Sequence, residues 1–539
     1  MDNRAIADRL DAFASLLDLA GASPHGPRAY RRAAELIRST KAPVDELVRE
    51  GRAQELRGIG PGIDARLREL VETGQIAQLA ELEREVSPEL IGLARYLGVP
   101  PRTMIEIGKT LGVRDLGELR EAAAGGRLGE AKGVGPHTEQ KLKAVLAGTS
   151  SLQERQRLVL SRARALVESV AAEVGGLEAG DTRRFADEPA RLVVVAPRSR
   201  GIVQRFAALP QIVGLVDWED DRALGVTVEG VAVELRLAEP AELGTALVRE
   251  TGSDAYVKAL EPLPPADEEQ GVYEALGIPW CPPELREQPF RGVPPRLLER
   301  ADLRGDLHCH TTWSDGSASV EEMGQAARNL GYDYLAICDH TRSVRVVPGL
   351  DADGVLSQIE EIREANERLA PFRLLAATEC DIHDDGALDL PDRVLAELDW
   401  VTASVHAGQR QSRAQLTKRV VEAMRHPAVR SISHPTGRLV GRRPPNDLDL
   451  EVAIEVAIET GTALEVNGLP DRLDLKGEHV RLCIDAGVPV VVATDSHSVR
   501  GLGNIELAVA TARRGWATAA DVVNTQPVEK LLAPKKPLR

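Results

Sequence analysis

The sequence predicts a multidomain protein in which three kinds of architecture follow one another. Residues 1–150 space their apolar residues as helices do, residues 151–260 contain valine-rich strand patterns, and residues 301–539 alternate strand-like and helical segments. We therefore expect an all-α region, then a small α+β domain, then a seven-stranded (β/α) barrel of the TIM type. The chain has 539 residues, enough for about three or four domains of ordinary size.

The composition is that of a globular protein with an acidic balance. Hydrophobic residues make up 43% and charged residues 28%, which excludes wholesale disorder and collagen-like structure. The net charge of −16 argues against a basic coat over the whole surface. Residues 1–150 carry 22 basic and 22 acidic groups, however, so nucleic-acid contacts are expected in that segment. The five cysteines form no CxxC pair and no apolar run could span a bilayer, so we expect a cytoplasmic protein without membrane contacts.

Two glycine turns in the first segment resemble each other. They are Gly58-Ile59-Gly60-Pro61-Gly62 and Gly133-Val134-Gly135-Pro136, and a helical pattern follows each. Such a turn exposes backbone N–H groups beside a helix N-terminus, which can bind a DNA phosphate without reading sequence. Glycine is also a common helix C-cap, so one turn alone would be weak evidence. Two copies predict DNA binding through Gly58, Gly60, Gly62, Gly133 and Gly135, while a less regular turn at 97–101 has lost the second glycine.

The middle of the chain changes character twice. The segments Arg191–Ala196 and Gly225–Leu237 are strand-like, which predicts a small α+β domain over residues 151–260. Nine of the 33 prolines fall within residues 262–295. Residues 261–300 are therefore expected to be a proline-rich connection, either a linker or an extended ordered strap, with a domain boundary near residue 300.

The last segment is rich in histidine at the ends of its predicted strands. Nine of the 11 histidines lie after residue 300. The strand-like segments are 305–311, 334–340, 374–381, 400–408, 429–437, 463–468 and 488–498. In a barrel of parallel strands, the C-terminal ends of the strands meet at one rim. The side chains that would meet there are His308, His310, Asp315, His340, Glu379, His406, His434, Asp495 and His497.

These side chains predict a metal centre. A single histidine is more often a satisfied core residue than a ligand, but six of the seven strand ends carry a histidine or carboxylate. Mixed imidazole and carboxylate ligands suit Mn or Zn, and also Fe. Nine ligands exceed what one or two divalent ions need, so we expect three.

The motifs GDLHCHTTWSDG, ICDH, SVH, SHPTGR and TDSH resemble those of the PHP (polymerase and histidinol phosphatase) phosphoesterases across residues 301–539. The resemblance implies a distorted seven-stranded barrel and a metal-activated water as nucleophile, with no protein nucleophile. Arg438 and Arg472 follow strand ends and could clamp a phosphate, although each could instead pair with a loop carboxylate. The ligand groups that the resemblance implies are His308, His310, Glu379 and Asp495 for one ion, Glu379, His406 and His434 for a second, and Asp315, His340 and His497 for the third.

The order of the modules resembles that of bacterial family X DNA polymerases of the PolX type. Helix-hairpin-helix repeats come first, then a palm and thumb, then the PHP domain. Family palms carry an Asp-x-Asp motif and a later third Asp, but these positions hold Arg191, Val193 and Glu234 here. Two-metal nucleotidyl transfer needs carboxylates that hold both ions. We therefore predict a degenerate nucleotidyltransferase palm and thumb over residues 151–260, with polymerase activity absent or very low.

The combination predicts a metal-dependent DNA phosphodiesterase, either a 3′→5′ exonuclease or a 3′-end-processing enzyme in DNA repair. It would act as a monomer on gapped or 3′-ended DNA. We expect a protein of the bacterial type that is located in the cytoplasm and associated with the nucleoid. The alternatives are an active gap-filling polymerase that uses Glu234 and other carboxylates, a small-molecule phosphomonoesterase of the histidinol phosphatase kind, and a non-catalytic DNA-binding scaffold. The first 300 residues resemble DNA-binding domains, and this favours the nuclease over the phosphomonoesterase.

Overall fold

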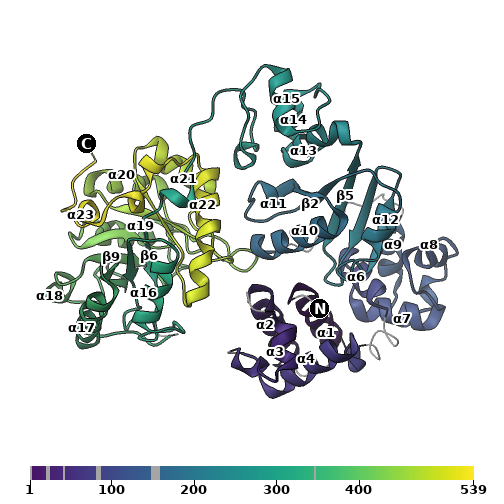
Figure 1. Ribbon diagram of the computed structural model, residues 1–539, viewed down its shortest axis with the longest axis horizontal. Helices are drawn as coiled ribbons and strands as arrows, with labels where there is room; N and C mark the ends of the chain where they lie inside the picture. The colour runs from purple at the N-terminus through teal and green to yellow at the C-terminus, as the bar shows by residue number, and fades with distance from the viewer. Residues whose placement is uncertain are drawn as a thin grey trace.

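The computed structural model describes residues 3–19, 25–40, 43–56, 58–79, 87–146, 158–344 and 347–538. These residues form a helical region, an α+β unit and a barrel (Figure 1). The predicted boundary between residues 150 and 151 lies outside the described residues. Along the described stretches, no helix combines the length and apolar character needed to cross a membrane.

The helical region consists of two groups of helices with separate cores. The first group is α1 (Asn3–Leu19), α2 (His25–Ser39), α3 (Val44–Arg49) and α4 (Pro61–Thr73). The second group is α6 (Pro88–Tyr96), α7 (Pro101–Leu111), α8 (Leu116–Ala124) and α9 (Pro136–Leu146). The core of the second group also includes Val216 and Val226 from the neighbouring sheet. Four of these helices begin with proline, whose missing N–H would have no helical partner at that position.

The α+β unit (residues 158–297) is built on a five-stranded sheet in the order β1-β2-β5-β4-β3. Its strands are β1 (Leu177–Ala179), β2 (Leu192–Pro197), β3 (Gly214–Trp218), β4 (Arg222–Val226) and β5 (Ala232–Ala238). Strands β2 and β5 are parallel, and the other pairs are antiparallel. The strand-like segment Gly225–Leu237 is divided between β4 and β5 by a turn with Gly230 at φ 81°. Valines continue the alternation through the turn, so the sequence pattern alone hid the break.

The helices of the unit are α10 (Leu160–Val174), α11 (Gly180–Arg183), α12 (Ile202–Ala207), α13 (Leu243–Thr251), α14 (Asp254–Leu260) and α15 (Glu269–Leu276). The proline-rich residues after Leu260 are ordered and share a core with the helices before them. Tyr256 and Tyr273 are fully buried in this core, and their hydroxyl groups lie 2.9 Å apart. The guanidinium of Arg286, also fully buried, pairs with Glu269 at 2.6 Å. The core therefore spans residue 260, and the segment behaves as an ordered strap.

The barrel has seven parallel strands in the order β12-β11-β10-β9-β8-β7-β6, so the predicted fold class is confirmed. The strands are β6 (Gly305–Cys309), β7 (Tyr334–Ile337), β8 (Arg373–Asp381), β9 (Trp400–Ser404), β10 (Val429–Ile432), β11 (Ala463–Asn467) and β12 (Val490–Ala493). The helices around them are α16 (Val320–Asn329), α17 (Ala352–Leu369), α18 (Asp392–Leu395), α19 (Arg413–Arg425), α20 (Leu450–Thr460), α21 (Gly477–Asp485), α22 (Ile505–Arg514) and α23 (Val528–Leu531). Each of the seven strand-like segments of the sequence overlaps one of these strands, and six contain theirs completely, while β8 begins one residue before its segment. Figure 1 shows the barrel beside the α+β unit, with α21 and α22 on the side that faces it.

The barrel closes where its last strand, β12, meets its first strand, β6. At the rim, the backbone N–H of His310 donates to the carbonyl of Ser496 at 2.8 Å. Lower down, the buried side chain of Asn524 donates to the carbonyls of Gly305 at 2.7 Å and Val492 at 2.8 Å, and accepts from the Val492 N–H at 3.1 Å. One amide group therefore joins both closing strands.

We predict that Asn524→Ala destabilises the barrel by about 2–4 kcal/mol, because it leaves buried backbone groups without partners. Urea unfolding followed by intrinsic fluorescence measures this change. Asn329→Ala is the control, since the exposed Asn329 side chain accepts a hydrogen bond from Gln325 on the surface of a helix. Equal stability of the two variants would contradict this account of barrel closure.

Candidate metal centre

The nine predicted ligands come together at the C-terminal rim of the barrel. The carboxylate of Glu379, near the end of β8, lies at the centre of the group. Its Oε1 is 2.9 Å from His434 Nε2 and 3.4 Å from His406 Nε2. Its Oε2 is 2.9 Å from His340 Nδ1 and 3.5 Å from His308 Nε2. Strands separated by many residues in the sequence thus converge on one carboxylate.

Three groups of these side chains place their ligand atoms within 4.8 Å of one another. The groups are His310, Asp315, His340 and His497; His308, His310 and Asp495; and His340, Glu379 and His406. The first corresponds to the third ion of the family resemblance, with His310 added. The second corresponds to the first ion, and Glu379 lies 3.5 Å and 3.7 Å from its two histidines. The third contains His340 in place of the expected His434, although His434 also contacts Glu379.

The chemistry of this donor set fits divalent cations. Glu379 is fully buried, yet neither carboxylate oxygen accepts a hydrogen bond from any described residue. The Nδ1 atoms of His310 and His340 are likewise buried without a hydrogen-bond partner in the described structure. Buried polar atoms without partners are costly, and a shared cation would satisfy these together. The residues could therefore hold metal ions of the kind that mixed nitrogen and oxygen ligands prefer.

The local electrostatics keep the central carboxylate ionised. Burial alone would raise the pKa of Glu379, but the imidazoles of His406, His340 and His308 outweigh it and hold that pKa well below its usual range. Burial also opposes a charged His310, and the neighbouring His340 and His497 add to that effect, so the pKa of His310 falls to about 4. A neutral imidazole and an ionised carboxylate are the forms that bind a metal ion.

Two of the ligands lie on strained backbone. His434 has a φ of 26° and Asp495 a φ of 53°, in the left-handed region that disfavours residues with a side chain. The N–H of His434 is held by the carboxylate of Glu465 at 2.9 Å. Strain of this kind persists only where the surrounding structure fixes it, and such positions cluster at functional sites.

Two carboxylates behind the predicted ligands contact their imidazoles, and neither was among the residues predicted from the sequence. Glu465 Oε1 lies 2.9 Å from His308 Nδ1, and Asp381 Oδ1 lies 3.3 Å from His406 Nδ1. Such partners fix the tautomer and the ring orientation of a metal-binding histidine. Both occur in predicted strands, and Glu465 comes from the only strand end without a predicted ligand. The signal for Glu465 was an acidic residue in a strand without other charged residues, and the signal for Asp381 was its place two residues after the predicted ligand Glu379.

The two arginines proposed as phosphate clamps differ in their surroundings. Arg472 lies beside the cluster, with Nε 3.7 Å from Asp495 Oδ2. Arg438 is buried and points away from the ligands, because Nε donates to the carbonyl of Arg472 at 2.9 Å and Nη2 pairs with Asp187 of the α+β unit at 2.7 Å. The geometry favours Arg472 as the side chain that could meet a phosphate at the cluster.

The two predicted DNA-binding turns have the same local structure. Each follows a short 3₁₀ helix, Ala53–Glu55 or Leu128–Glu130, and precedes a helix that begins with proline. Gly58 and Gly133 have positive φ of 114° and 87°, which explains the need for glycine there. A Cβ atom at Gly60, Gly62 or Gly135 would meet no heavy atom within 4 Å, so the backbone is open to a ligand. In the irregular third turn, by contrast, the carbonyl of Gly98 already accepts from Lys141.

The three palm positions lie close together, and two of them, Arg191 and Glu234, belong to an ion-pair network. Val193 on β2 is paired in register with Glu234 on β5, yet its side chain is fully buried in an apolar cluster. The guanidinium of Arg191 lies 2.7 Å from Glu250 and 3.5 Å from Glu234. Arg236 adds a second cation, 3.1 Å from Glu234. The carboxylates at this place are therefore neutralised by arginines.

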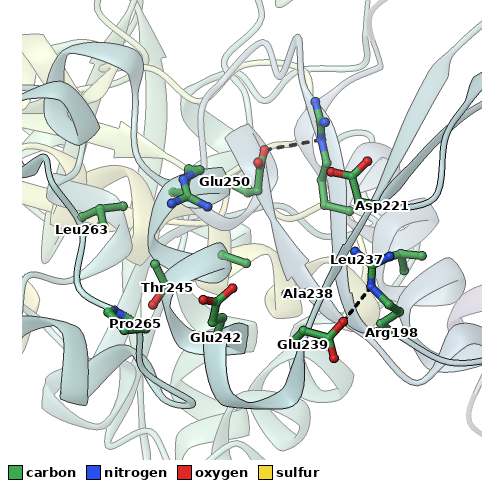
Figure 2. A pocket seen from close by; sticks show the side chains of 13 residues that line it. Arg198, Asp221, Leu237, Ala238, Glu239, Glu242, Thr245, Glu250, Leu263 and Pro265 are labelled. Atoms are coloured by element: carbon green, nitrogen blue, oxygen red, sulfur yellow. Dashed lines mark ion pairs between the residues drawn. The ribbon is translucent and has the colours of Figure 1, made fainter.

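Two cavities lie beside this network, with volumes of about 630 and 470 Å³. Arg191 and Glu234 line the larger one. Figure 2 shows the smaller one, with Thr245 and Glu250 of α13, and Glu242 just before that helix, opposite Leu237 and Ala238 of β5. Both cavities are lined by mixed charges, so neither presents a compact group of free carboxylates.

Comparison with known proteins gives matches to both ends of the chain and to its whole length. The helix-hairpin-helix domain family matches residues 1–76, and the PHP domain family matches residues 306–442. A DNA polymerase/3′-5′ exonuclease PolX of Bacillus subtilis (strain 168) is 31% identical over 568 aligned residues, which cover 99% of each chain. A probable phosphatase of Acetivibrio thermocellus is 32% identical over 36% of this chain and 78% of its own. One from Thermoanaerobacter sp. (strain X514) is 26% identical over 43% of this chain and 95% of its own.

We predict that Glu379→Gln lowers the number of Mn²⁺ or Zn²⁺ ions bound per chain by at least one, because a neutral amide is a weaker ligand for divalent cations than an ionised carboxylate. Metal analysis after dialysis measures the stoichiometry. Added Mn²⁺ should raise the thermal unfolding midpoint of the unmodified chain more than that of the variant. Glu397→Gln is the control, since Glu397 is exposed and lies 3.8 Å from Arg363. An unchanged metal content in Glu379→Gln would contradict the central role of this carboxylate.

Proposed function

This chain belongs to the bacterial PolX family of DNA polymerase/3′-5′ exonucleases, and we propose that within this family it acts as a metal-dependent DNA phosphodiesterase. Its reaction would be 3′→5′ exonuclease digestion or 3′-end processing in DNA repair. The observation that carries this proposal is the contrast between two sites. The nine side chains that we propose as ligands lie together at the barrel rim, whereas an arginine faces the remaining carboxylates of the proposed palm.

The barrel residues would bind both the cations and the phosphate. The proposed ligands are the nine rim side chains, and the proposed ions are three, of Mn or Zn and also of Fe. Such ions, when bound, supply an activated water and stabilise charge on phosphate oxygens. Glu465 and Asp381 would hold His308 and His406 in the orientation needed for binding. Arg472 would neutralise a phosphate oxygen beside Asp495.

We further propose that the palm does not catalyse nucleotide addition. Mg²⁺ binding there would require free carboxylates, but Glu234 and Glu250 both pair with Arg191. The charge on that guanidinium would repel a cation. The neighbouring Arg183 and Arg184, which match palm positions of the family, pair with Glu269 at 2.8 Å and Glu287 at 3.1 Å. These ion pairs leave the palm without an open set of ligands for two metals.

DNA binding is assigned to the two hairpin turns, which present open backbone at helix N-termini. Their phosphate contacts would position a gapped or 3′-ended duplex without reading its sequence. Because the chain is acidic overall, we expect its affinity for DNA to be modest and to weaken as the salt concentration rises. We also propose that the protein acts as a monomer and associates with the nucleoid through DNA.

A second candidate function is hydrolysis of small phosphate monoesters. It is favoured by relatives whose names read probable phosphatase and which cover 36% and 43% of this chain. A PHP barrel alone suits either substrate. The helix-hairpin-helix match at residues 1–76 is the observation that favours DNA instead.

We predict that the protein shortens a 5′-labelled primer on a gapped template in the presence of Mn²⁺ and all four dNTPs. The loss of one rim ligand in His308→Ala should abolish the shortening, because that side chain contacts Glu379, Glu465 and Asp495. Product lengths on a denaturing gel measure the outcome.

The same assay separates the three enzymatic functions. Extended primers in the His308→Ala variant, where digestion cannot mask them, would overturn the proposal for the palm. An unchanged primer together with rapid hydrolysis of a small phosphate monoester would favour the second candidate.

We also predict that Gly60→Asp and Gly135→Asp each weaken binding to gapped duplex DNA about tenfold at low salt, because the new carboxylate repels the phosphate that the turn would bind. Neither Cβ atom would meet a neighbour within 4 Å, so the fold should be unaffected. Gly503→Asp is the matched control, since it adds the same charge at an equally open glycine of the barrel. Equal affinities of all three variants would remove the turns from the DNA interface.

A further inference from the structure

The α+β unit contacts the barrel close to the metal-binding rim. Phe185, just after α11, packs with Leu160, Leu473 and Leu507 in a small apolar cluster between the two bodies. Leu473 belongs to the loop 469–475, which follows β11 and carries Arg472. The contact therefore reaches the same loop that brings Arg472 to the cluster.

Arg438 joins this loop to the α+β unit by three contacts of one guanidinium. Its Nε donates to the carbonyl of Arg472 at 2.9 Å, and its Nη2 donates to the carbonyl of Leu473. The same Nη2 lies 2.7 Å from Asp187 Oδ2. Only 10% of the Arg438 side chain and 14% of the Asp187 side chain are exposed, so solvent screens this pair little.

The backbone of the loop 469–475 is strained, so contacts from other parts of the protein are needed to hold its conformation. Leu473 has a φ of 48°, which disfavours a residue with a side chain. Asp474 is fully buried and accepts hydrogen bonds from the N–H and hydroxyl of Thr436 through Oδ1. Its Oδ2 has no hydrogen-bond partner in the described structure. The conformation therefore depends on groups outside the loop.

We propose that Asp187 of the α+β unit is a positioning residue for phosphate binding at the barrel rim, acting through Arg438 on the loop that carries Arg472. Asp187 supplies the charge that holds the Arg438 guanidinium at the two loop carbonyls. Without that charge, a nearly buried guanidinium loses its counter-ion, which is strongly unfavourable. It would turn toward the free oxygen of Asp474 or toward solvent, and the loop and Arg472 would lose their fixed position.

This inference rests on the proposed function, and it gives the α+β unit a role in the reaction of the barrel. The unit would contribute to phosphate binding although its own palm lacks a set of metal ligands. Asp187 Oδ1 also lies 3.9 Å from Arg514 Nε of α22, so the control has to separate that contact from the shorter pair with Arg438. Arg514 pairs with Glu287 at 2.9 Å as well, and loss of the Glu287 charge would disturb Arg514 while leaving the Arg438–Asp187 pair in place. A further ion pair between the two bodies joins Arg513 to Glu284 at 2.7 Å.

The test measures two quantities on the full-length, Mn²⁺-loaded protein. The first is kcat and KM for shortening of the gapped primer, and the second is the Kd for inorganic phosphate by calorimetry. Asp187→Asn should raise both KM and the phosphate Kd about tenfold while leaving the affinity for Mn²⁺ unchanged. Asp187→Glu should restore most of the loss because it keeps the charge. Glu287→Gln is the matched control and should change both values less than twofold.

A double-mutant cycle identifies the route of the effect. In an Arg472→Gln background, Asp187→Asn should have little further effect on KM or on phosphate binding, because both changes act through one side chain. Additive effects would overturn the proposal, as would an Asp187→Asn variant that binds phosphate like the unmodified protein. Equal losses in Asp187→Asn and Glu287→Gln would reduce Asp187 to a general docking contact.

The two readouts keep this inference separate from the proposed function. If the unmodified protein shortens no primer but Asp187→Asn still weakens phosphate binding, the nuclease proposal fails and the positioning role stands. If the protein shortens primers and Asp187→Asn behaves normally in both measurements, the positioning role fails alone.

Discussion

The barrel depends on one unusual constraint, a fully buried carboxylate whose two oxygens accept no hydrogen bond from the described residues. Glu379 can remain ionised there only because four imidazoles surround it at 2.9 to 3.5 Å. Each imidazole then needs its own orientation, which Glu465 and Asp381 supply for His308 and His406. Carboxylates and imidazoles therefore alternate outward from Glu379. The parallel strands bring these side chains together because the C-terminal ends of all the strands meet at one rim.

The carboxylates at the palm positions of the α+β unit are also partly buried, but they are neutralised by a different kind of partner. Glu234 and Glu250 are partly buried acidic side chains, and arginines neutralise them from within the protein. Burial opposes the charged form of Arg191, but Glu234 and Glu250 outweigh it and raise the pKa of its guanidinium. Because the Arg191 guanidinium already neutralises these carboxylates, they do not need a bound metal ion to balance their charge. The same chain thus contains one carboxylate cluster suited to external cations and one that already contains its own.

Much of this organisation could be predicted from the sequence, because it is encoded in local patterns. Each barrel strand is a short apolar run followed by polar residues, so both the strands and the nine side chains at their ends could be identified. The sharing of His310 and His340 between groups could not, because it depends on how strands twist toward each other. Glu465 was missed because a single acidic residue in a largely apolar strand has no periodicity. Asp381 was missed because the strand end that carries it already supplied the predicted ligand Glu379. The turn at Gly230 was hidden because valines occur on both sides of it.

The contact between the two bodies uses other residues of the α+β unit than the three positions at which family palms carry their carboxylates. The residues that face the barrel, Phe185, Asp187 and Glu287, lie after α11 and after the strap helix α15. Of the positions that would hold palm metals, Arg191 lies just before β2, Val193 lies on β2 and Glu234 lies on β5. Val193 is buried in an apolar core. A change at Arg191 or Val193 therefore alters neither the ion pair with Arg438 nor the apolar cluster around Leu473. The contact with the barrel and the positions that correspond to the family's palm carboxylates are therefore physically separate parts of this unit.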